Sequence, residues 1–203
     1  MVLVVDYRMG NIGSIVNMFR RINVETIVSN DAKEIERADK IVLPGVGSYD
    51  AGMRNLRAMG LIEPLRRRAV EQRVPLLGIC LGMQLLARSS EEGSEPGLGW
   101  VDAKVVKFSL GLGANMKIPH MGWNSVRLSK ESLLFRQMYE NPRFYFVHSY
   151  YVLCGRETDV LTRTLYGSEF VSSFQVDNII GVQFHPEKSH KFGMKLLENF
   201  AAL

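Results

Sequence analysis

The sequence predicts an α/β fold: an open, mostly parallel or mixed sheet flanked by helices, with antiparallel strands in the second half of the chain. In the first half, apolar runs alternate with helix-like segments, which is typical of parallel strands joined by crossover helices. In the second half, apolar runs follow one another with turn residues between them, which favours antiparallel pairing. The 203 residues suffice for a full hydrophobic core, so residues 1–203 are expected to form a single domain.

The elements of the first half follow from hydrophobic patterning. The first strand is expected at residues 1–5 (MVLVV), because a β-branched run without polar alternation suits a strand buried on both faces. Asn11 can cap a helix over 12–22, where apolar residues recur at helical spacing. The other predicted elements are strands at 24–28, 40–43 and 76–79, a helical stretch at about 51–72 interrupted near Gly60 and Pro64, and a helix from the fourth strand to about Arg88.

The second half is expected to contain closely spaced strands and a closing helix. The segment 91–99 is rich in Glu and Gly and is predicted to be a loop, and the amphipathic segment 190–203 is predicted to be a helix. Strands are predicted at 100–108, 143–147, 150–153, 160–166, 170–175 and 179–184.

Composition excludes several classes of function. The formal net charge of +4 is too mild to indicate nucleic-acid binding without a concentrated basic stripe. No apolar run approaches the roughly 20 residues of a membrane helix, and the N-terminal apolar run ends at Asp6, too early for a signal peptide. The two cysteines form no disulfide framework, and Cys154 in an apolar run is typical of a core residue. A reactive Cys80 would need a reducing compartment, so a cytoplasmic protein is expected.

The most informative segment is Gly78-Ile79-Cys80-Leu81-Gly82, which joins the fourth strand to a helix. Glycines on both sides of a cysteine permit the tight, strained turn of a nucleophile elbow. The turn lifts the side chain off the sheet and places it at a helix N-terminus, where the helix dipole favours a thiolate. Cys80 is therefore the candidate nucleophile.

A base for this nucleophile is expected downstream, in Gly181-Val182-Gln183-Phe184-His185-Pro186-Glu187. A cysteine is mostly protonated at neutral pH and needs a neighbouring base. Pro186 favours an extended His185, and residues two apart on an extended chain point to the same side, so Glu187 can hold the second ring nitrogen. Cys80, His185 and Glu187 form a candidate catalytic triad. Taken alone, His-Pro-Glu would instead be a satisfied histidine beside a surface glutamate.

An attacked carbonyl also needs donors for its oxyanion. The N–H of Leu81 can supply one, and Val46 and Gly47 of the Pro44-Gly45-Val46-Gly47 loop a second, although this loop could equally be an ordinary turn. Its glycines permit a peptide plane to flip, so the oxyanion hole could form only on demand. A metal site is a weaker interpretation, because Cys-x-x-Cys and His-x-x-x-His are missing, and residues 6–13 lack the dinucleotide-binding spacing. No metal and no cofactor are predicted.

At these residues the sequence resembles the class I, or triad-type, glutamine amidotransferases. The elbow GICLGMQ, the loop PGVG and the segment GVQFHPEKS match motifs of the family. The resemblance runs nearly from one end of the chain to the other. Within the family, DYxxGN near the N-terminus, PHMGWN at 119–124 and FVHSY at 146–150 resemble the glutaminase subunit of imidazole glycerol phosphate synthase.

The resemblance implies that glutamine is hydrolysed to glutamate and ammonia through a glutamyl thioester on Cys80. It also implies substrate-binding roles for Gln84, Glu92, Ser149 and Tyr150, and an oxyanion role for Gly47. Without the resemblance, Gln84 could be an exposed helix residue and Glu92 a solvated loop carboxylate.

A partner is implied as well: a separate (β/α)₈ cyclase subunit, which would form a heterodimer with this chain, receive the ammonia and make imidazole glycerol phosphate for histidine biosynthesis. Asn11, Pro119, Trp123 and Lys188 match positions at that interface, and the isolated subunit is expected to be nearly silent. Arg8 stands where the family usually has glycine. This departure suggests a paralogue that serves another synthase, such as one that amidinates a sugar for surface polysaccharide. A non-catalytic interaction module and another cysteine hydrolase, such as a γ-glutamyl peptidase, are the remaining alternatives.

Overall fold

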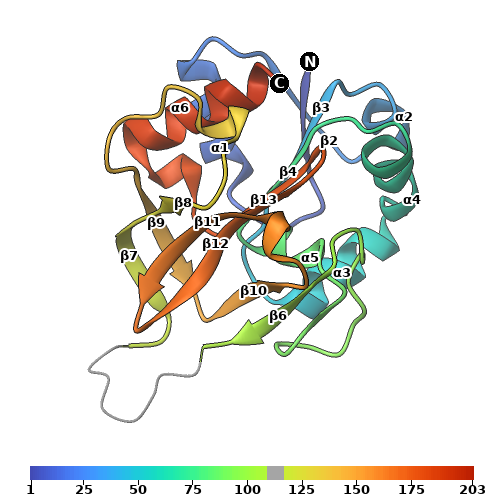
Figure 1. Ribbon diagram of the computed structural model, residues 1–203. Coiled ribbons are helices and arrows are strands. Elements are labelled where there is room, and N and C mark those ends of the chain that lie inside the picture. Colours follow the sequence, from blue (N-terminus) through green and yellow to red (C-terminus); the bar gives the residue numbers. More distant parts are fainter. Residues whose placement is uncertain (109–116) are drawn as a thin grey trace.

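The computed structural model describes residues 1–108 and 117–203 and shows a twisted central sheet with helices on both faces (Figure 1). The strands of the main sheet are β1 Val2–Val5, β2 Thr26–Ser29, β3 Lys40–Leu43, β4 Leu76–Ile79, β5 Ser89–Ser90, β6 Ala103–Lys107, β8 Arg127–Leu128, β10 Tyr150–Cys154, β11 Val160–Tyr166, β12 Ser168–Val176 and β13 Ile179–Val182. A second, two-stranded sheet pairs β7 His120–Ser125 with β9 Arg143–His148.

The helices and single turns complete the fold. The α-helices are α1 Ile12–Arg21, α2 Ala32–Ile35, α3 Tyr49–Ala58, α4 Ile62–Arg66, α5 Leu81–Leu85 and α6 His190–Ala201. A π-helical turn covers Arg67–Glu71, and 3₁₀ turns cover Leu133–Phe135, Glu157–Asp159 and Pro186–Lys188. In the part of the chain that the structure describes, no helix has the length and apolar character needed to span a bilayer.

The main sheet changes from parallel to antiparallel within the second half of the chain, as the sequence predicts. Its strand order is β2-β1-β3-β4-β13-β12-β10-β6-β5, with β11 and β8 attached beside β12. Neighbours from β2 to β13 run parallel, whereas β12 runs antiparallel to both β13 and β10. Strand β13 is therefore the junction, because it lies parallel to β4 on one side and antiparallel to β12 on the other.

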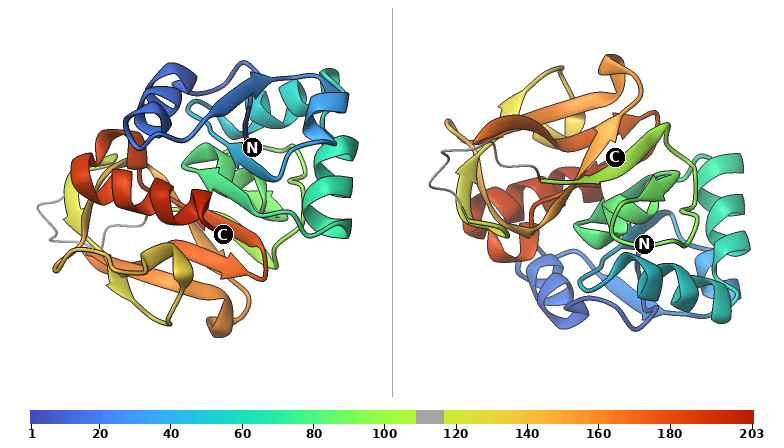
Figure 2. Two further views of the ribbon diagram at one scale, coloured as in Figure 1. Left: turned by 90° about the horizontal axis from the view of Figure 1, so that it is seen from above. Right: turned by 90° about the horizontal axis from the view of Figure 1, so that it is seen from below.

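Successive side chains of β1 point to opposite faces of the sheet, and helices cover both faces. Leu3 and Val5 point into one hydrophobic cluster together with side chains of α3, α4 and α5, whereas Val2 and Val4 point into another with side chains of α1 and α6. All four residues are buried, as expected for a continuous apolar run in a parallel sheet. Figure 2 shows the blue α1 and the red α6 on one side of the sheet and the teal α4 on the other.

The structure differs from the sequence-based expectation at several boundaries. The predicted helix interruption near Gly60 occurs, because Gly60 has φ +66° between α3 and α4. The predicted break at Pro64 is wrong: Pro64 lies in the first turn of α4, where a missing N–H leaves no helical hydrogen bond unmade. Strand β7 was not predicted at all, although its residues belong to the PHMGWN segment.

Candidate functional site

The turn between β4 and α5 holds Cys80 in a conformation that few residues adopt. Cys80 has φ +52° and ψ −108°, and its N–H donates to the Val182 carbonyl at 2.8 Å. A Cβ on Gly82 would collide with the carbonyl oxygen of Leu43 on β3, and a Cβ on Gly78 would lie 2.8 Å from the Gly82 backbone. Close packing of strand and helix therefore requires both glycines of the Gly-x-Cys-x-Gly segment, and it fixes the strained turn. Cys80 is 7% exposed, so its thiol lies in a pocket rather than on an open surface.

His185 and Glu187 lie at the end of β13, beside the end of β4. The Nδ1–H of His185 donates to Oε1 of Glu187 at 2.7 Å, and both side chains are almost fully buried. The His185 N–H donates to the Tyr145 carbonyl at 2.9 Å, which ties this segment to β9. The expected pairing of the two side chains occurs, but not through an extended chain. His185 is extended, whereas Glu187 lies in the 3₁₀ turn Pro186–Lys188 and reaches back to the ring.

The charges around His185 favour its protonated form. Burial, the largest single effect, lowers the pKa of His185, but the Cys80 sulfur and the Glu187 carboxylate together outweigh it and raise this pKa well above its ordinary value. Nε2 of His185 has no hydrogen-bond partner among the described residues. The imidazolium can therefore pair electrostatically with a Cys80 thiolate while it keeps one N–H free to be transferred.

The Pro44–Gly47 loop follows β3 and covers the elbow. The Leu81 N–H, expected to be a free oxyanion donor, instead donates to the Gly45 carbonyl at 3.3 Å. Tyr7 is fully buried beneath the loop and donates its hydroxyl to the Pro44 carbonyl at 2.5 Å, and the same burial raises the pKa of its phenol. Val46 is exposed and Gly47 has φ +116°. In this arrangement the oxyanion hole is not formed.

Gln84 lies one turn after Cys80 on α5 and is 5% exposed, so it is not the exposed helix residue that its sequence context allows. Its amide nitrogen donates to the Tyr150 carbonyl at 3.2 Å and to Oε1 of Gln183 at 3.0 Å. The amide nitrogen of Gln183 lies 3.7 Å from the Cys80 sulfur and donates to it. Gln183 was missed as a candidate, although a polar residue inside the apolar run before His185 is a usable signal.

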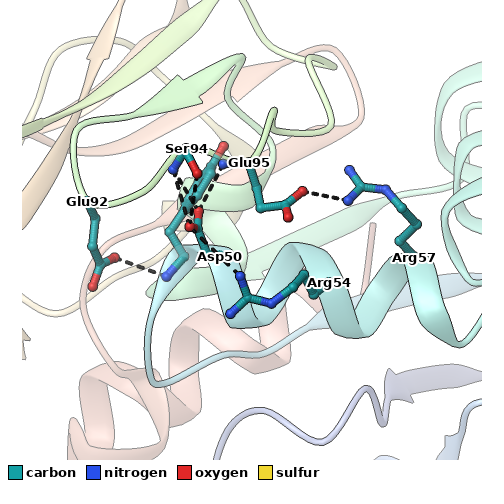
Figure 3. A network of polar contacts seen from close by, with 7 residues as sticks. Asp50, Arg54, Arg57, Glu92, Ser94 and Glu95 are labelled. Atoms are coloured by element: carbon teal, nitrogen blue, oxygen red, sulfur yellow. Dashed lines mark hydrogen bonds and ion pairs between the residues drawn. The ribbon is translucent and has the colours of Figure 1, made fainter.

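Glu92 is held against the N-terminus of α3 by a network on the loop after β5 (Figure 3). Its Oε2 accepts the Tyr49 N–H at 3.1 Å and so caps a helix whose preceding residue makes no side-chain cap. Asp50 accepts the N–H groups of Ser94 and Glu95, each at 3.0 Å, and fixes the loop on the other side. The pKa of Glu92 is raised overall: burial and the nearby Asp50 charge raise it, and the hydrogen bond from the Tyr49 N–H lowers it.

These groups line one cavity of about 350 Å³. Its walls are Val46, Gly47, Cys80, Leu81, Gln84, Glu92, Pro119, Val147, His148, Ser149, Tyr150 and His185. The structure thus brings the predicted nucleophile, base, oxyanion loop and substrate-binding residues to the same place. A carboxylate, an amide and a thiol around a cavity of this size suit a small polar substrate with an amino group and a carbonyl. Among the described residues, no group of three or more His, Cys, Asp or Glu side chains is arranged to hold a metal ion.

The positions expected at a partner interface lie in or beside β7, in the turn after His185 and at the start of α1. Trp123 on β7 is exposed and lies opposite Tyr145 on β9, and Nζ of Lys188 lies 5.5 Å from the centroid of the Tyr145 ring. The turn that contains Lys188 packs against α1, whose N-cap is Asn11. The fourth position, Pro119, is exposed and also lines the cavity.

Comparison with known families and curated proteins gives matches over nearly the whole chain. The family described as glutamine amidotransferase class-I matches residues 3–203. The chain is 56% identical to "Imidazole glycerol phosphate synthase subunit HisH 2" of Methanococcus maripaludis, over 98% of each chain. It is 46% identical to the protein of the same name in Pseudomonas aeruginosa and to "subunit HisH 1" of Campylobacter jejuni, over 100% of each chain.

Solved structures share the fold at much lower identity. One solved structure, described as a glutamine amidotransferase, is 20% identical with a TM-score of 0.72, and the match covers 100% of both chains. A chain of PurLQS from Thermotoga maritima is 20% identical, also with a TM-score of 0.72, and the match covers 99% of this chain and 97% of that one. At these identities the likeness concerns the fold alone.

Proposed function

Since the chain belongs to the class I glutamine amidotransferase family, we propose that residues 1–203 form a single glutaminase domain, the glutaminase subunit of imidazole glycerol phosphate synthase. The observation that carries the proposal is the cavity that joins Cys80, His185, Gln84 and Glu92. Relatives that carry the subunit's name, up to 56% identical over almost their full length, support the assignment to histidine biosynthesis.

The reaction starts from the Cys80 thiolate and the His185 imidazolium. The sulfur adds to the carbonyl carbon of the glutamine side chain, and the amide nitrogen takes the Nε2 proton as its bond to carbon breaks, so that ammonia leaves and a glutamyl thioester remains. Water then adds to the thioester carbon while His185 accepts its proton, and the thiolate departs to release glutamate. Glu187 holds Nδ1 at 2.7 Å, so it fixes the ring and stabilises its positive charge.

The substrate is held at both ends. Glu92 presents a carboxylate to the cavity from the N-terminus of α3, and it suits the α-ammonium group of glutamine. Gln84, Ser149 and Tyr150 line the same cavity and can hold the rest of the substrate. The amide to be cleaved then faces Cys80 at the elbow.

The oxyanion hole requires a change in the Pro44–Gly47 loop. The Gly45 carbonyl that now accepts the Leu81 N–H belongs to the same peptide plane as the Val46 N–H. Rotation of this plane would withdraw the carbonyl and point the Val46 N–H toward the space it leaves, beside a free Leu81 N–H. Two donors would then face the developing oxyanion. A resting state without an oxyanion hole explains why glutaminase activity would depend on binding of the partner.

The partner proposed is a (β/α)₈ cyclase subunit that forms a heterodimer with this chain and receives ammonia directly. Ammonia released into water at neutral pH becomes ammonium, which is not nucleophilic, so a shared path protects it. Asn11, Pro119, Trp123 and Lys188 form the proposed interface, and Pro119 also lines the cavity.

The proposal is tested by glutamate release from the complex with the cyclase subunit. Replacement Cys80→Ala should abolish glutamate release and ammonia transfer while leaving the unfolding transition intact. Cys154→Ala is the matched control, because the second cysteine lies on β10 away from the triad. Wild-type rates of glutamate release in the Cys80→Ala complex would contradict the mechanism.

A second candidate is a paralogous glutaminase subunit that feeds another synthase, for example one that amidinates a sugar. Arg8 favours it, because this exposed cation has φ +65°, where glycine is easily accommodated, in the segment that leads to the interface residue Asn11. The numbered names of the relatives also imply more than one such subunit in those organisms. The two candidates differ in which purified synthase subunit stimulates glutamate release.

A further inference from the structure

A chain of hydrogen bonds runs from β7 to the Cys80 sulfur and contains five side chains outside the triad, four of them buried. At its outer end, the Asn124 amide on β7 lies 3.0 Å from the Leu165 carbonyl and 3.3 Å from Nε2 of His120. Nδ1 of His120 lies 3.0 Å from Nε2 of His148, and Nδ1 of His148 lies 2.8 Å from the Tyr150 carbonyl. His120 and His148 are almost fully buried, so each of these contacts must pair a donor with an acceptor.

The Tyr150 carbonyl and, at the outer end, the Leu165 carbonyl decide the directions of the bonds in the outer half. A carbonyl oxygen only accepts, so His148 carries a proton on Nδ1, and the Asn124 amide nitrogen that donates to Leu165 also faces Nε2 of His120 as a donor. His120 must then donate from Nδ1, and its own bare Nε2 accepts from the Asn124 amide. Both rings are neutral in this arrangement, since a proton on either Nε2 would face another donor. Burial agrees with this, because it lowers the pKa of His120 to about 4 and that of His148 to about 3.

The Tyr150 carbonyl also decides the direction of the inner half. The Tyr150 oxygen also accepts from Gln84, so the amide nitrogen of Gln84 faces it and a second N–H remains for Oε1 of Gln183. Gln183 has then used its oxygen as an acceptor. Its amide nitrogen is forced toward Cys80, where it lies 3.7 Å from the sulfur. The flipped amide would set two NH₂ groups against each other and place an oxygen lone pair against the thiolate.

Aromatic packing holds the His120 ring in place in the outer half of the chain. His120 stacks between Phe146 and Tyr166, with centroids at 4.7 and 4.0 Å and interplanar angles of 26° and 29°. An imidazole enclosed in this way cannot rotate out of the chain without disrupting the aromatic packing. Gln84 and Gln183 are themselves buried, so the Tyr150 carbonyl and not the solvent sets the direction of the Gln183 donor.

We propose that Gln183 is a further residue of the reaction, which holds the Cys80 sulfur as an anion through an amide N–H whose direction the Tyr150 carbonyl imposes through Gln84. The inference rests on the proposed glutaminase function. Its chemical basis is that a hydrogen bond to a charged acceptor is about twice as strong as a neutral one, so the donor favours thiolate over thiol. This donor is a group other than the His185 ring, so the thiolate retains a donor after the proton has left Nε2 of His185.

The test measures two properties of the variants Gln183→Met and Gln183→Leu. Both replace the amide with an apolar group of similar size and so remove the donor. The first is the alkylation rate of Cys80 by iodoacetamide at pH 7 in the full chain, read by mass spectrometry of the Cys80 peptide. The second is glutamate release with the cyclase subunit bound. Gln175→Met on β12 is the matched control, because Gln175 bonds to Ser132 and Asp177 and does not line the cavity.

Both Gln183 variants are expected to slow Cys80 alkylation and glutamate release by about tenfold to a hundredfold, whereas the Gln175 variant keeps wild-type rates. Unfolding midpoints recorded alongside separate this effect from a loss of structure. Wild-type alkylation and wild-type glutamate release in a folded Gln183 variant would overturn the inference and leave the glutaminase assignment standing. A wild-type complex that releases no glutamate, with alkylation still slowed in the variants, would overturn the glutaminase assignment and retain the contact.

Discussion

Gly82 at the start of α5 packs directly against the backbone of β3. The variant Gly82→Ala therefore tests whether glycine is required at the elbow. The new Cβ would collide with the Leu43 carbonyl oxygen and lie 2.9 Å from the Leu43 carbonyl carbon. These atoms belong to the backbone of β3, a central strand paired on both sides, so they cannot move away as a side chain would. Helix α5 must shift instead, and Cys80 precedes it directly.

Two effects follow from this displacement. Overpacking against a fixed backbone is expected to lower the free energy of unfolding by roughly 1–3 kcal/mol. A shift of the nucleophile by about 1 Å is expected to lower kcat/KM for glutamine by about 10²-fold. Urea unfolding followed by far-UV circular dichroism measures the first effect, and glutamate release from the complex measures the second.

Gly13→Ala is the matched control for this prediction. Gly13 lies in the first turn of α1, and a Cβ there would have no atom within 4 Å. Alanine in a helix loses less conformational entropy than glycine, so this variant should be more stable by roughly 0.5–1 kcal/mol. If Gly82→Ala unfolded at the wild-type urea concentration with wild-type activity, the argument that glycine is required at the elbow would be refuted.

Other predictions concern titration and binding in the same site. Glu187→Gln removes the negative partner of His185 Nδ1 and should lower kcat by roughly 10²–10⁴-fold, measured as glutamate release at saturating glutamine; an unchanged kcat would exclude a role for the carboxylate. Glu92→Gln should raise KM for glutamine by about tenfold with a smaller effect on kcat, because a carboxylate paired with an ammonium is lost, and a change in kcat alone would contradict the assignment. His120 and His148 have folded pKa values lowered to about 4 and about 3, below the unfolded value of about 6.5, so the unfolded chain binds more protons and stability rises with pH between about 3 and 6.5. Replacing both with Phe should flatten that rise in urea unfolding, and an unchanged slope would show that the rings are charged in the folded state.

The sequence was most informative where burial on both faces leaves a continuous apolar run. Strands β1, β3 and β4 were predicted close to their true bounds, because parallel strands under helices admit few polar residues. Strand β7 shows the opposite case. Its sequence HMGWNS contains Gly122 at φ +123° and exposes Met121 and Trp123, so neither composition nor alternation marks it as a strand. It forms because all six residues pair with β9, a contact that only the tertiary structure supplies.

The sequence identifies the motifs of the candidate site, but not the hydrogen bonds between them. Cys80, His185 and Glu187 are recognisable because their local sequence dictates a strained turn and a buried ion pair. The occupied Leu81 N–H was not predictable, because the orientation of the Gly45 peptide plane depends on the packing of the loop over α5. Gln183 was overlooked for a similar reason, since its role depends on neighbours about 100 positions away in sequence.

The strand order explains how distant segments come to share one reaction. Strands β3, β4 and β13 are parallel neighbours at the centre of the sheet, with Leu43 beside Gly78 and Ile79 beside Val182. The carboxyl ends of parallel neighbours lie at one edge, so the proposed oxyanion loop, nucleophile and base each follow one of three adjacent strands. Strand β12 pairs with β13 on one side and with β10 on the other, and Tyr150 of β10 lines the cavity. The place of β13 beside β4 completes the proposed site, because His185, the proposed base of Cys80, follows β13 directly along the chain.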